Sequence, residues 1–369
     1  MADNSFSCIV RDLPATVPFV GPEAIERRRG RPFAARLGAN ESVFGPSPRV
    51  VEAIGNAAAE IWKYGDPENF ELKAALAAFH GIAPANIAVG EGVDALLGYA
   101  VRLFADPQDT IVSSLGGYPT FNYHVAGYGC RLVTVPYRDD REDPVALIET
   151  ARRERARIVY LANPDNPMGT WHDATIVEGM MGLVPEGMTM ILDEAYADTA
   201  PRGAIPVLDV SNPGVVRFRT FSKAYGLAGI RVGYAIGEAG VIAAFDKIRN
   251  HFAVSRLAQV AALAALADQD YLVGVVRGIE SARARIAAIA SENGLAAIPS
   301  ATNFVTVDCQ RDGMFARRVL DALIERDIFV RMPSVAPLDR CIRVSVGTGS
   351  DLDLLASVLP AALADASRA

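Results

Sequence analysis

The sequence has little of what metal sites, disulfide-bonded proteins and nucleic-acid-binding proteins need. It holds only 4 cysteines and 4 histidines in 369 residues, with no Cys-x-x-Cys pair and no histidine placed beside a cysteine at metal-ligand spacing. We therefore expect no metal, and we interpret the cysteines as reduced thiols of a cytoplasmic protein. The 36 basic residues are outnumbered by 43 acidic ones, and this net charge of −7 argues against a nucleic-acid partner. The cysteines are Cys8, Cys130, Cys309 and Cys341.

Long apolar runs are also missing. The most apolar stretch, residues 253–267, contains Arg256 and Gln259 and is shorter than the roughly 20 residues of a membrane span. Residues 1–12 lack the basic start and following apolar run of a secretory signal. We expect a protein that is neither secreted nor inserted into a membrane.

The residues that are present predict a large α/β domain. Apolar residues make up 51% of the chain, which is enough for a large core, and the length favours two lobes. Short β-branched runs alternate with helical patterns, as in a sheet covered by helices on both faces. The run Ile158-Val159-Tyr160-Leu161 is apolar on both faces, which is typical of a central parallel strand. The expected strands are residues 86–89, 110–113, 131–135, 157–162, 188–193, 215–221 and 232–236.

The pattern changes after residue 268. A long helix over 271–293 precedes a strand at 303–308, and further strands and helices follow to the end of the chain. This order predicts a smaller α+β lobe. The opening segment is rich in proline, glycine and arginine, and we expect it to pack on that lobe. The predicted domains are therefore 45–268 for the large lobe, and 1–44 with 269–369 for the small one.

The strongest motif spans residues 220–234, a strand followed by a segment rich in small residues. Lys223 comes at the end of that strand, where open α/β sheets bind ligands. A dry pocket with neighbouring cations lowers the pKa of a lysine and frees its amine to form a Schiff base. Arg231 offers a fork suited to phosphate, and Ser222 offers a hydroxyl. The simpler alternative is a surface lysine in a loop.

Three further motifs follow strands. The acids Asp193 and Glu194 end an apolar run and precede Tyr196. In isolation such a pair after a strand is more often a helix cap. Residues 163–170 read Asn-Pro-Asp-Asn-Pro-Met-Gly-Thr, which predicts a loop. Residues 90–94, Gly-Glu-Gly-Val-Asp, predict a helix start whose backbone N–H groups can approach a phosphate. No Gly-x-Gly-x-x-Gly stands there, which disfavours a nicotinamide-binding fold.

Together these motifs resemble fold type I aminotransferases, which depend on pyridoxal 5′-phosphate (PLP). The resemblance implies that Lys223 carries PLP as a Schiff base and acts in catalysis. It also implies that Asp193 binds the pyridine nitrogen, making the ring an electron sink, while Tyr196 and Asn166 donate to the phenolic oxygen. The residues it assigns to the cofactor's phosphate are Val93, Asp94, Ser222 and Arg231.

Within that group the sequence is most similar to the histidinol-phosphate aminotransferases. This resemblance implies a homodimer in which Tyr64 reaches the partner's cofactor phosphate. It also implies that Phe121 stacks on the PLP ring and that Arg343 and Asn166 bind the substrate. The chain departs from the family's usual pattern at Ser42-Val43, at Gly65 and at Phe121, which bears on the substrate. The segments that carry the similarity are residues 37–41, 45–48, 63–67 and 342–348.

The expected reaction is a ping-pong transamination between histidinol phosphate and 2-oxoglutarate. Two alternatives share the scaffold: an aminotransferase for aromatic or other amino acids, and a decarboxylase resembling the threonine-phosphate type, because PLP supports both chemistries. A PLP-binding module fused to a DNA-binding domain is disfavoured, since no helix-turn-helix domain fits ahead of residue 21.

Overall fold

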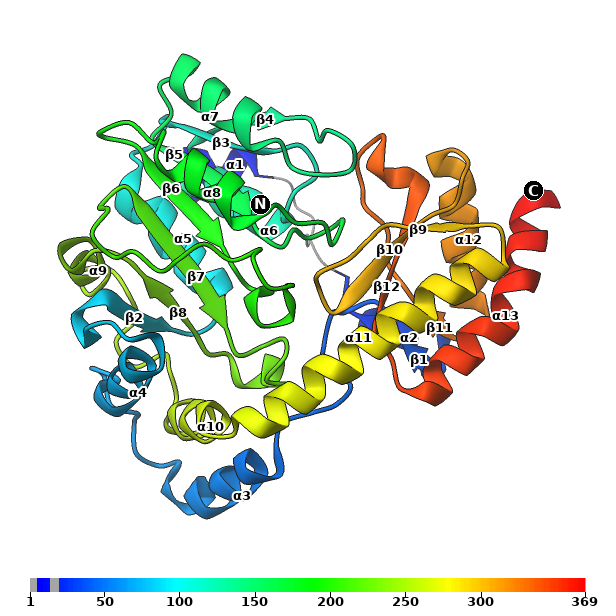
Figure 1. Ribbon diagram of the computed structural model, residues 1–369, viewed down its shortest axis with the longest axis horizontal. Coiled ribbons are helices and arrows are strands. Elements are labelled where there is room, and N and C mark those ends of the chain that lie inside the picture. Colours follow the sequence, from blue (N-terminus) through cyan, green and yellow to red (C-terminus); the bar gives the residue numbers. More distant parts are fainter. Residues whose placement is uncertain (1–4, 14–19, 369) are drawn as a thin grey trace.

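The structure is a computed structural model that describes residues 5–13 and 20–368 and forms a large and a small lobe (Figure 1). A seven-stranded sheet crosses the large lobe in the order β2-β8-β7-β6-β5-β3-β4. Strand β8 is antiparallel to both neighbours, and the other neighbours pair in parallel. The predicted α/β fold with a mostly parallel sheet is confirmed. The strands are β2 (Ile87–Gly90), β3 (Thr110–Ser114), β4 (Arg131–Val135), β5 (Ile158–Ala162), β6 (Thr189–Asp193), β7 (Val215–Thr220) and β8 (Gly233–Ile236).

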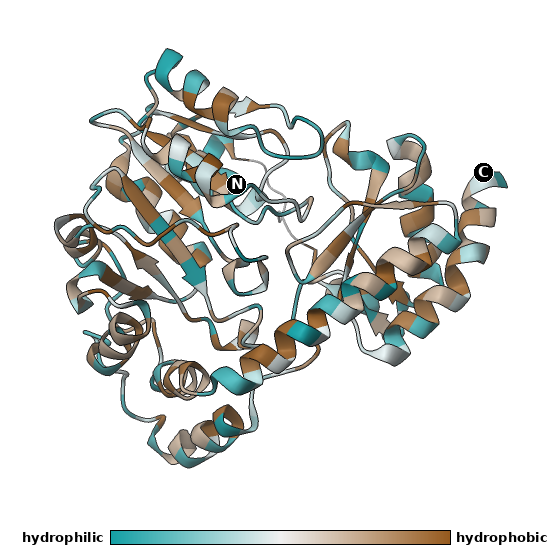
Figure 2. Ribbon diagram, viewed as in Figure 1, coloured by the Kyte–Doolittle hydropathy of each residue, from teal (hydrophilic) through white to brown (hydrophobic). Residues whose placement is uncertain are grey.

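Helices cover both faces of this sheet because successive side chains of a strand point to opposite faces. Ile111 and Val112, neighbours on β3, belong to two different cores. Helices α5, α6 and α9 pack on one face of the sheet. Helices α7 and α8 pack on the opposite face, and on that same face α4 and α10 pack over β2 and β8. Figure 2 shows the apolar sheet between these layers. The helices are α3 (Pro48–Ala57), α4 (Phe70–His80), α5 (Val93–Phe104), α6 (Pro119–Gly127), α7 (Pro144–Arg153), α8 (Ala174–Met181), α9 (Ala239–Phe245) and α10 (Arg256–Leu266).

Local sequence explains where several helices begin. Asp143 caps α7, where its Oδ1 accepts a hydrogen bond from the Ala146 N–H at 3.1 Å. Ser255 caps α10 in the same way, by accepting from the Ala258 N–H at 3.2 Å. Helix α5 differs, because its first N–H groups follow Gly92 and receive no side-chain cap. These N–H groups remain available to a ligand.

The small lobe is built on two short sheets. Strands β12, β10 and β9 pair antiparallel in that order, while β1 and β11 pair in parallel. Helices α11, α12 and α13 enclose one apolar core with these strands, and α11 runs from the large lobe along the small one (Figure 1). The elements are α2 (Pro22–Arg29), β1 (Ala35–Arg36), α11 (Gln269–Glu292), β9 (Ala296–Ala297), β10 (Phe304–Asp308), α12 (Gly313–Glu325), β11 (Ile328–Phe329), β12 (Cys341–Ser345) and α13 (Gly349–Arg368).

Helix α1 (Cys8–Asp12) departs from the expectation that residues 1–44 pack on the small lobe. It contacts α6 of the large lobe, and Ile9 lies so close to Gly129 that a Cβ there would come within 2.8 Å of it. Ile9 therefore lies against the large lobe, which the local sequence did not reveal. Residues 1–4 and 14–19 of that segment lie outside the described residues.

The short 3-10 helices are η2 (Ala58–Glu60), η3 (Pro84–Asn86), η4 (Ala197–Thr199), η5 (Ala228–Ile230) and η6 (Leu338–Arg340).

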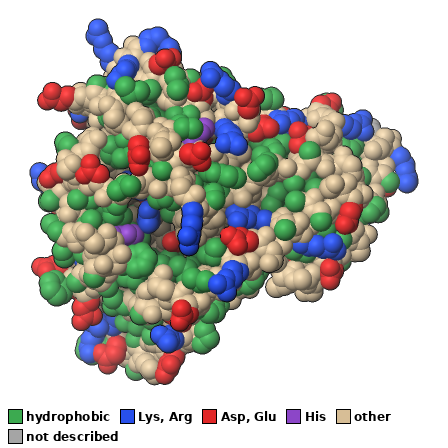
Figure 3. All heavy atoms as spheres, in the orientation of Figure 1, with side chains coloured by type: hydrophobic (Ala, Val, Ile, Leu, Met, Phe, Trp, Pro, Cys, Tyr) green, Lys and Arg blue, Asp and Glu red, His purple; other side chains and the backbone are tan. Residues whose placement is uncertain are grey.

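The surface mixes charges of both signs. On the face in Figure 3, acidic and basic side chains lie interspersed among apolar and neutral ones. A helix with the length and apolar character of a membrane span does not occur in the described part of the chain.

The carboxyl ends of the parallel strands β5, β6 and β7 point toward the small lobe (Figure 1), and this edge carries the predicted motifs.

Candidate active site

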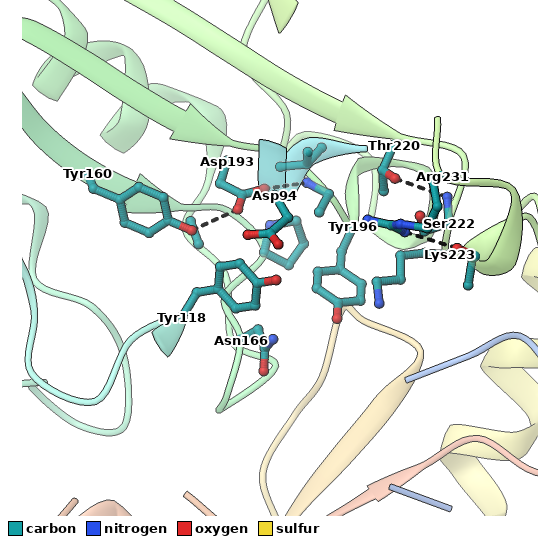
Figure 4. A pocket seen from close by; sticks show the side chains of 15 residues that line it. Asp94, Tyr118, Tyr160, Asn166, Asp193, Tyr196, Thr220, Ser222, Lys223 and Arg231 are labelled. Atoms are coloured by element: carbon teal, nitrogen blue, oxygen red, sulfur yellow. Dashed lines mark hydrogen bonds between the residues drawn. The ribbon is translucent and has the colours of Figure 1, made fainter. Parts of the chain in front are cut away.

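A cavity lies at the carboxyl ends of β5, β6 and β7 (Figure 4). Parallel strands bring these ends together, so motifs far apart in the sequence meet at one edge of the sheet. Most of the predicted site residues line the cavity. Its lining consists of Val93, Asp94, Tyr118, Tyr160, Ala162, Pro164, Asn166, Asp193, Ala195, Tyr196, Thr220, Ser222, Lys223, Ala228 and Arg231.

Lys223 reaches into the cavity from the segment after β7 (Figure 4). Its Nζ donates a hydrogen bond to the Asn40 carbonyl at 3.2 Å and lies 5.5 Å from the centre of the Tyr196 ring. Burial and the positive charges of Arg343 and Arg231 lower the pKa of Lys223 to about 8. Roughly a tenth of this side chain is therefore an unprotonated amine at pH 7, far more than for an ordinary lysine, and this is the form that attacks an aldehyde.

Asp193 ends β6 on the opposite side of the cavity. Its Oδ2 accepts from the Tyr160 hydroxyl at 2.7 Å, and its Oδ1 accepts from the Ala195 N–H at 3.0 Å. A carboxylate has about four acceptor positions, so Asp193 can still accept from a protonated nitrogen in the cavity. Burial raises the pKa of Asp193, and a cation placed beside it would oppose that shift.

The neighbouring acid, Glu194, has a different environment. Its carboxylate is fully buried and accepts from Arg217 at 2.6 and 3.0 Å and from Arg219 at 3.0 Å. Burial would raise the pKa of Glu194, but the charges of Arg219 and Arg217 outweigh it and lower the pKa. Glu194 therefore holds β6 and β7 together and takes no place in the cavity lining.

The loop after β5 contains two asparagines with separate environments. Asn163 is fully buried and secures the loop: its Nδ2 donates to the Ala204 carbonyl at 2.8 Å, and its Oδ1 accepts from the His172 N–H at 2.8 Å. Asn166 lines the cavity, and its Oδ1 accepts from the guanidinium of Arg343. An arginine can only donate, so the Nδ2 group of Asn166 remains free to donate to a ligand.

Arg343 approaches the site from β12 of the small lobe. Its guanidinium lies 5.0 Å from the centre of the Phe304 ring, and its Nε is buried with no hydrogen-bond partner among the described residues. Burial is the main cause that lowers the pKa of Arg343 to about 10, still well above neutrality. A partly buried guanidinium whose buried Nε is an unused donor fits an anionic group of a substrate.

The start of α5 and Arg231 form an anion-binding corner. Arg231 lies against Gly92, where a Cβ would come within 2.5 Å of the guanidinium, and Gly92 has a φ of 94°. Only glycine combines this backbone with so close an approach. The uncapped N–H groups of α5 and the Arg231 guanidinium fit a phosphate. The predicted residues Val93, Asp94 and Ser222 line the same cavity.

Phe121, which the resemblance places against the PLP ring, does not line the cavity. Phe121 is fully buried beneath the cavity, where it stacks on Tyr160 with ring centres 4.3 Å apart. Tyr118, at the start of α6, lines the cavity instead (Figure 4). The sequence offered both aromatic residues within one short segment, but the pitch of α6 directs Phe121 into the core. Tyr160, Thr220 and Asn40 are further residues near the site that sequence reasoning missed.

Tyr64 does not belong to the cavity of its own chain. It precedes α4, its surface is 76% exposed, and its ring packs against Phe252 with ring centres 4.9 Å apart. Other exposed apolar residues occur nearby in the sequence, among them Ile61, Trp62 and Phe70. Tyr64 is therefore accessible at the surface of the chain.

Comparisons with known proteins agree with this geometry. A histidinol-phosphate aminotransferase from Moorella thermoacetica is 35% identical over 337 residues, which cover 90% of this chain and 86% of that protein. The crystal structure of histidinol-phosphate aminotransferase from Sinorhizobium meliloti in complex with pyridoxal-5′-phosphate is 55% identical, with a TM-score of 0.96 over 100% of this chain and 99% of that chain.

More distant structures share the fold alone. L-threonine-O-3-phosphate decarboxylase from Porphyromonas gingivalis is 19% identical, with a TM-score of 0.77 over 89% of this chain and 99% of that chain. Residues 35–359 match the family model described as aminotransferase class I and II. This match spans most of the chain, and the chain belongs to the class I and II aminotransferase family.

Proposed function

We propose that this chain is a PLP-dependent aminotransferase that transfers an amino group between histidinol phosphate and 2-oxoglutarate, a reaction of histidine biosynthesis. The observation that carries the proposal is Lys223: an amine with a lowered pKa, enclosed in a cavity between a carboxylate and an anion-binding corner. The 55% identity to a histidinol-phosphate aminotransferase supports the choice of substrate.

The cavity residues fit PLP at both of its ends. The N–H groups at Val93 and Asp94, the Ser222 hydroxyl and Arg231 would hold the phosphate. Asp193 would accept from the pyridine nitrogen, while Asn166 and Tyr196 would donate to the phenolic oxygen. The bound cofactor supplies an electron-withdrawing ring that weakens bonds at the substrate's amine-bearing carbon.

The chain's own groups would then move the proton and hold the substrate. Once its amine is free, Lys223 Nζ can take the proton from the amine-bearing carbon, because its pKa of about 8 suits a base near neutral pH. The Arg343 guanidinium would bind the phosphate of one substrate and a carboxylate of the other, a task suited to a planar donor fork.

We also propose a homodimer in which Tyr64 completes the partner's phosphate site. Mixing two inactive variants tests this arrangement. A Tyr64→Ala chain keeps Lys223, and a Lys223→Ala chain keeps Tyr64, so a mixed dimer would contain one complete site. We expect activity to return when the two variants are unfolded and refolded together. Two chains that both carry Tyr64→Ala and Lys223→Ala are the control, and no recovery in the mixture would contradict the arrangement.

The substrate is tested by half-reactions followed by absorbance of the bound cofactor. The purified PLP-loaded protein is mixed separately with histidinol phosphate, phenylalanine, aspartate and glutamate. Fastest conversion with histidinol phosphate, together with conversion by glutamate and no release of carbon dioxide, supports the proposal. Faster conversion with phenylalanine or aspartate would assign another amine, and release of carbon dioxide would assign a decarboxylase.

A further inference from the structure

We propose that Asn40 is a positioning residue that fixes the direction of the Tyr196 hydroxyl proton and so makes Tyr196 a donor into the cavity. The inference rests on the proposed function, in which the acceptor is the phenolic oxygen of PLP. Asn40 lies between β1 and α3, whereas Tyr196 follows β6. Their contact therefore joins two parts of the chain that meet only in the folded protein.

Asn40 is held firmly in its place. It is 3% exposed and has a φ of 55°, a left-handed conformation that asparagine adopts more readily than most residues. Its carbonyl accepts from Lys223 Nζ at 3.2 Å and from Asn303 Nδ2 at 3.0 Å. The backbone of Asn40 thus contacts the predicted catalytic lysine, while its side chain forms hydrogen bonds with Tyr196 and Ser345.

The hydrogen bonds around the Asn40 amide determine where each proton lies. The Asn40 N–H donates to Ser345 Oγ at 3.0 Å, and the Ser345 hydroxyl donates to Asn40 Oδ1 at 2.8 Å. With Oδ1 facing Ser345, the Nδ2 group faces Tyr196 and donates to its hydroxyl oxygen at 3.1 Å. An amide NH₂ group cannot accept, so the proton of Tyr196 must point elsewhere. Tyr196 lines the cavity, and its proton is free to point there.

The reversed amide orientation satisfies the same atoms less well. It would place Nδ2 toward Ser345 and leave the Ser345 hydroxyl proton with no acceptor among the residues described. Ser345 is 2% exposed, and an unpaired buried hydroxyl is destabilising. Ser345 therefore selects the orientation that makes Tyr196 a donor. Because Ser345 lies on β12, the position of the small lobe sets the direction of a proton in the large lobe.

The variant Asn40→Asp tests this directly. Aspartate tolerates the same backbone conformation, but an ionised carboxylate only accepts, so Tyr196 would turn its proton away from the cavity. The readout is the midpoint pH of the visible absorbance change of PLP bound to Lys223 in the whole enzyme. A donor to the ionised phenolic oxygen lowers that midpoint, so we expect Asn40→Asp to raise it by about one to two pH units.

A second background separates proton direction from simple charge. An added carboxylate would itself raise the midpoint, but that effect would persist without the Tyr196 hydroxyl. We expect the shift caused by Asn40→Asp to disappear for the most part in a Tyr196→Phe background. Asn69→Asp is the matched control, since Asn69 is also 3% exposed with a φ of 52° and lies outside the cavity lining; it should leave the midpoint unchanged.

Two results would overturn the inference: no shift with Asn40→Asp, or the same shift in both backgrounds. If Asn40→Asp does not fold, Ser345→Ala replaces it, since losing the fixed amide orientation should give a smaller rise that is also absent with Tyr196→Phe. Failure of the proposed function looks different, because the unaltered protein would then retain no absorbance band of lysine-bound PLP once free PLP is removed by gel filtration.

Discussion

The side chain of Asn166, on the loop after β5, accepts a hydrogen bond from the guanidinium of Arg343 on β12. The two residues come from different lobes, and their contact joins the large-lobe end of the cavity to the small lobe. It also orients both partners: Asn166 keeps its NH₂ group for a ligand, and Arg343 keeps a buried Nε without a partner among the described residues.

Replacing Arg343 with lysine should impair substrate binding more than charge alone predicts. Lysine keeps the positive charge but loses the planar fork and the contact that orients Asn166. One hydrogen bond to a charged group contributes roughly 1.5–3 kcal/mol, so we expect kcat/KM for the amine substrate to fall about 10- to 100-fold. Arg326→Lys is the control, because Arg326 pairs with Asp365 away from the cavity. Equal kinetics for Arg343→Lys and the unaltered enzyme would contradict the assignment.

Replacing Glu194 with glutamine should weaken the fold strongly. The change leaves Arg217, which is 1% exposed, without its buried counter-charge. Breaking a buried ion pair on one side costs about 3–5 kcal/mol, and denaturant unfolding would measure the loss. Glu23→Gln offers a control, since Glu23 pairs with Arg36 at the surface and its side chain is 58% exposed. A similar small effect for both variants would show that Glu194 is not the buried anchor described above.

The lowered pKa of Lys223 predicts how stability depends on pH. Its pKa is about 8 in the folded chain against an ordinary 10.5, so between these values the unfolded chain binds more protons, and stability rises with pH. Below about pH 8 the buried ammonium costs up to about 3 kcal/mol. We expect Lys223→Met to stabilise the cofactor-free protein at pH 7, with the gain fading toward pH 10.5.

Unfolding of the two proteins at several pH values measures this difference. Titration of groups far from Lys223 cancels in the comparison. Lys247→Met is the control, since Lys247 is an exposed lysine of the large lobe and its replacement should give no such pH-dependent gain. A constant difference between Lys223→Met and the parent at every pH would argue against the lowered pKa.

The aromatic residues Tyr118 and Phe121 should respond differently to truncation. Tyr118→Ala removes a ring that lines the cavity, and lost stacking and apolar contact should weaken PLP binding about tenfold or more. Phe121→Leu should instead lower the free energy of unfolding by about 1 kcal/mol or more and leave PLP affinity unchanged. Equilibrium titration with PLP and denaturant unfolding separate the two effects. If only the Phe121 variant bound PLP more weakly, Phe121 and not Tyr118 would be the ring that contacts the cofactor.

Much of the site could be predicted because its residues follow strands. Lys223, Asp193 and Asn166 each come just after a β-branched, apolar run, and parallel strands place such positions at one edge of the sheet whatever the details of packing. The helix start at Val93 was recognisable for a related reason, since its glycine precedes a helical pattern. Local patterns are enough wherever the backbone geometry itself fixes the position.

What the sequence by itself determined is therefore the α/β architecture, the order of the motifs and the residue types at the strand ends, since these depend on periodicity and short-range geometry. The tertiary structure decided which aromatic residue of the segment 118–121 faces the cavity, because the axis of α6 is set by packing against the sheet. It also decided the partners of Arg343, Tyr196 and Asn40. Asn40 and Tyr196 are 156 residues apart in the chain, and no local pattern encodes a hydrogen bond that exists only when two lobes come together.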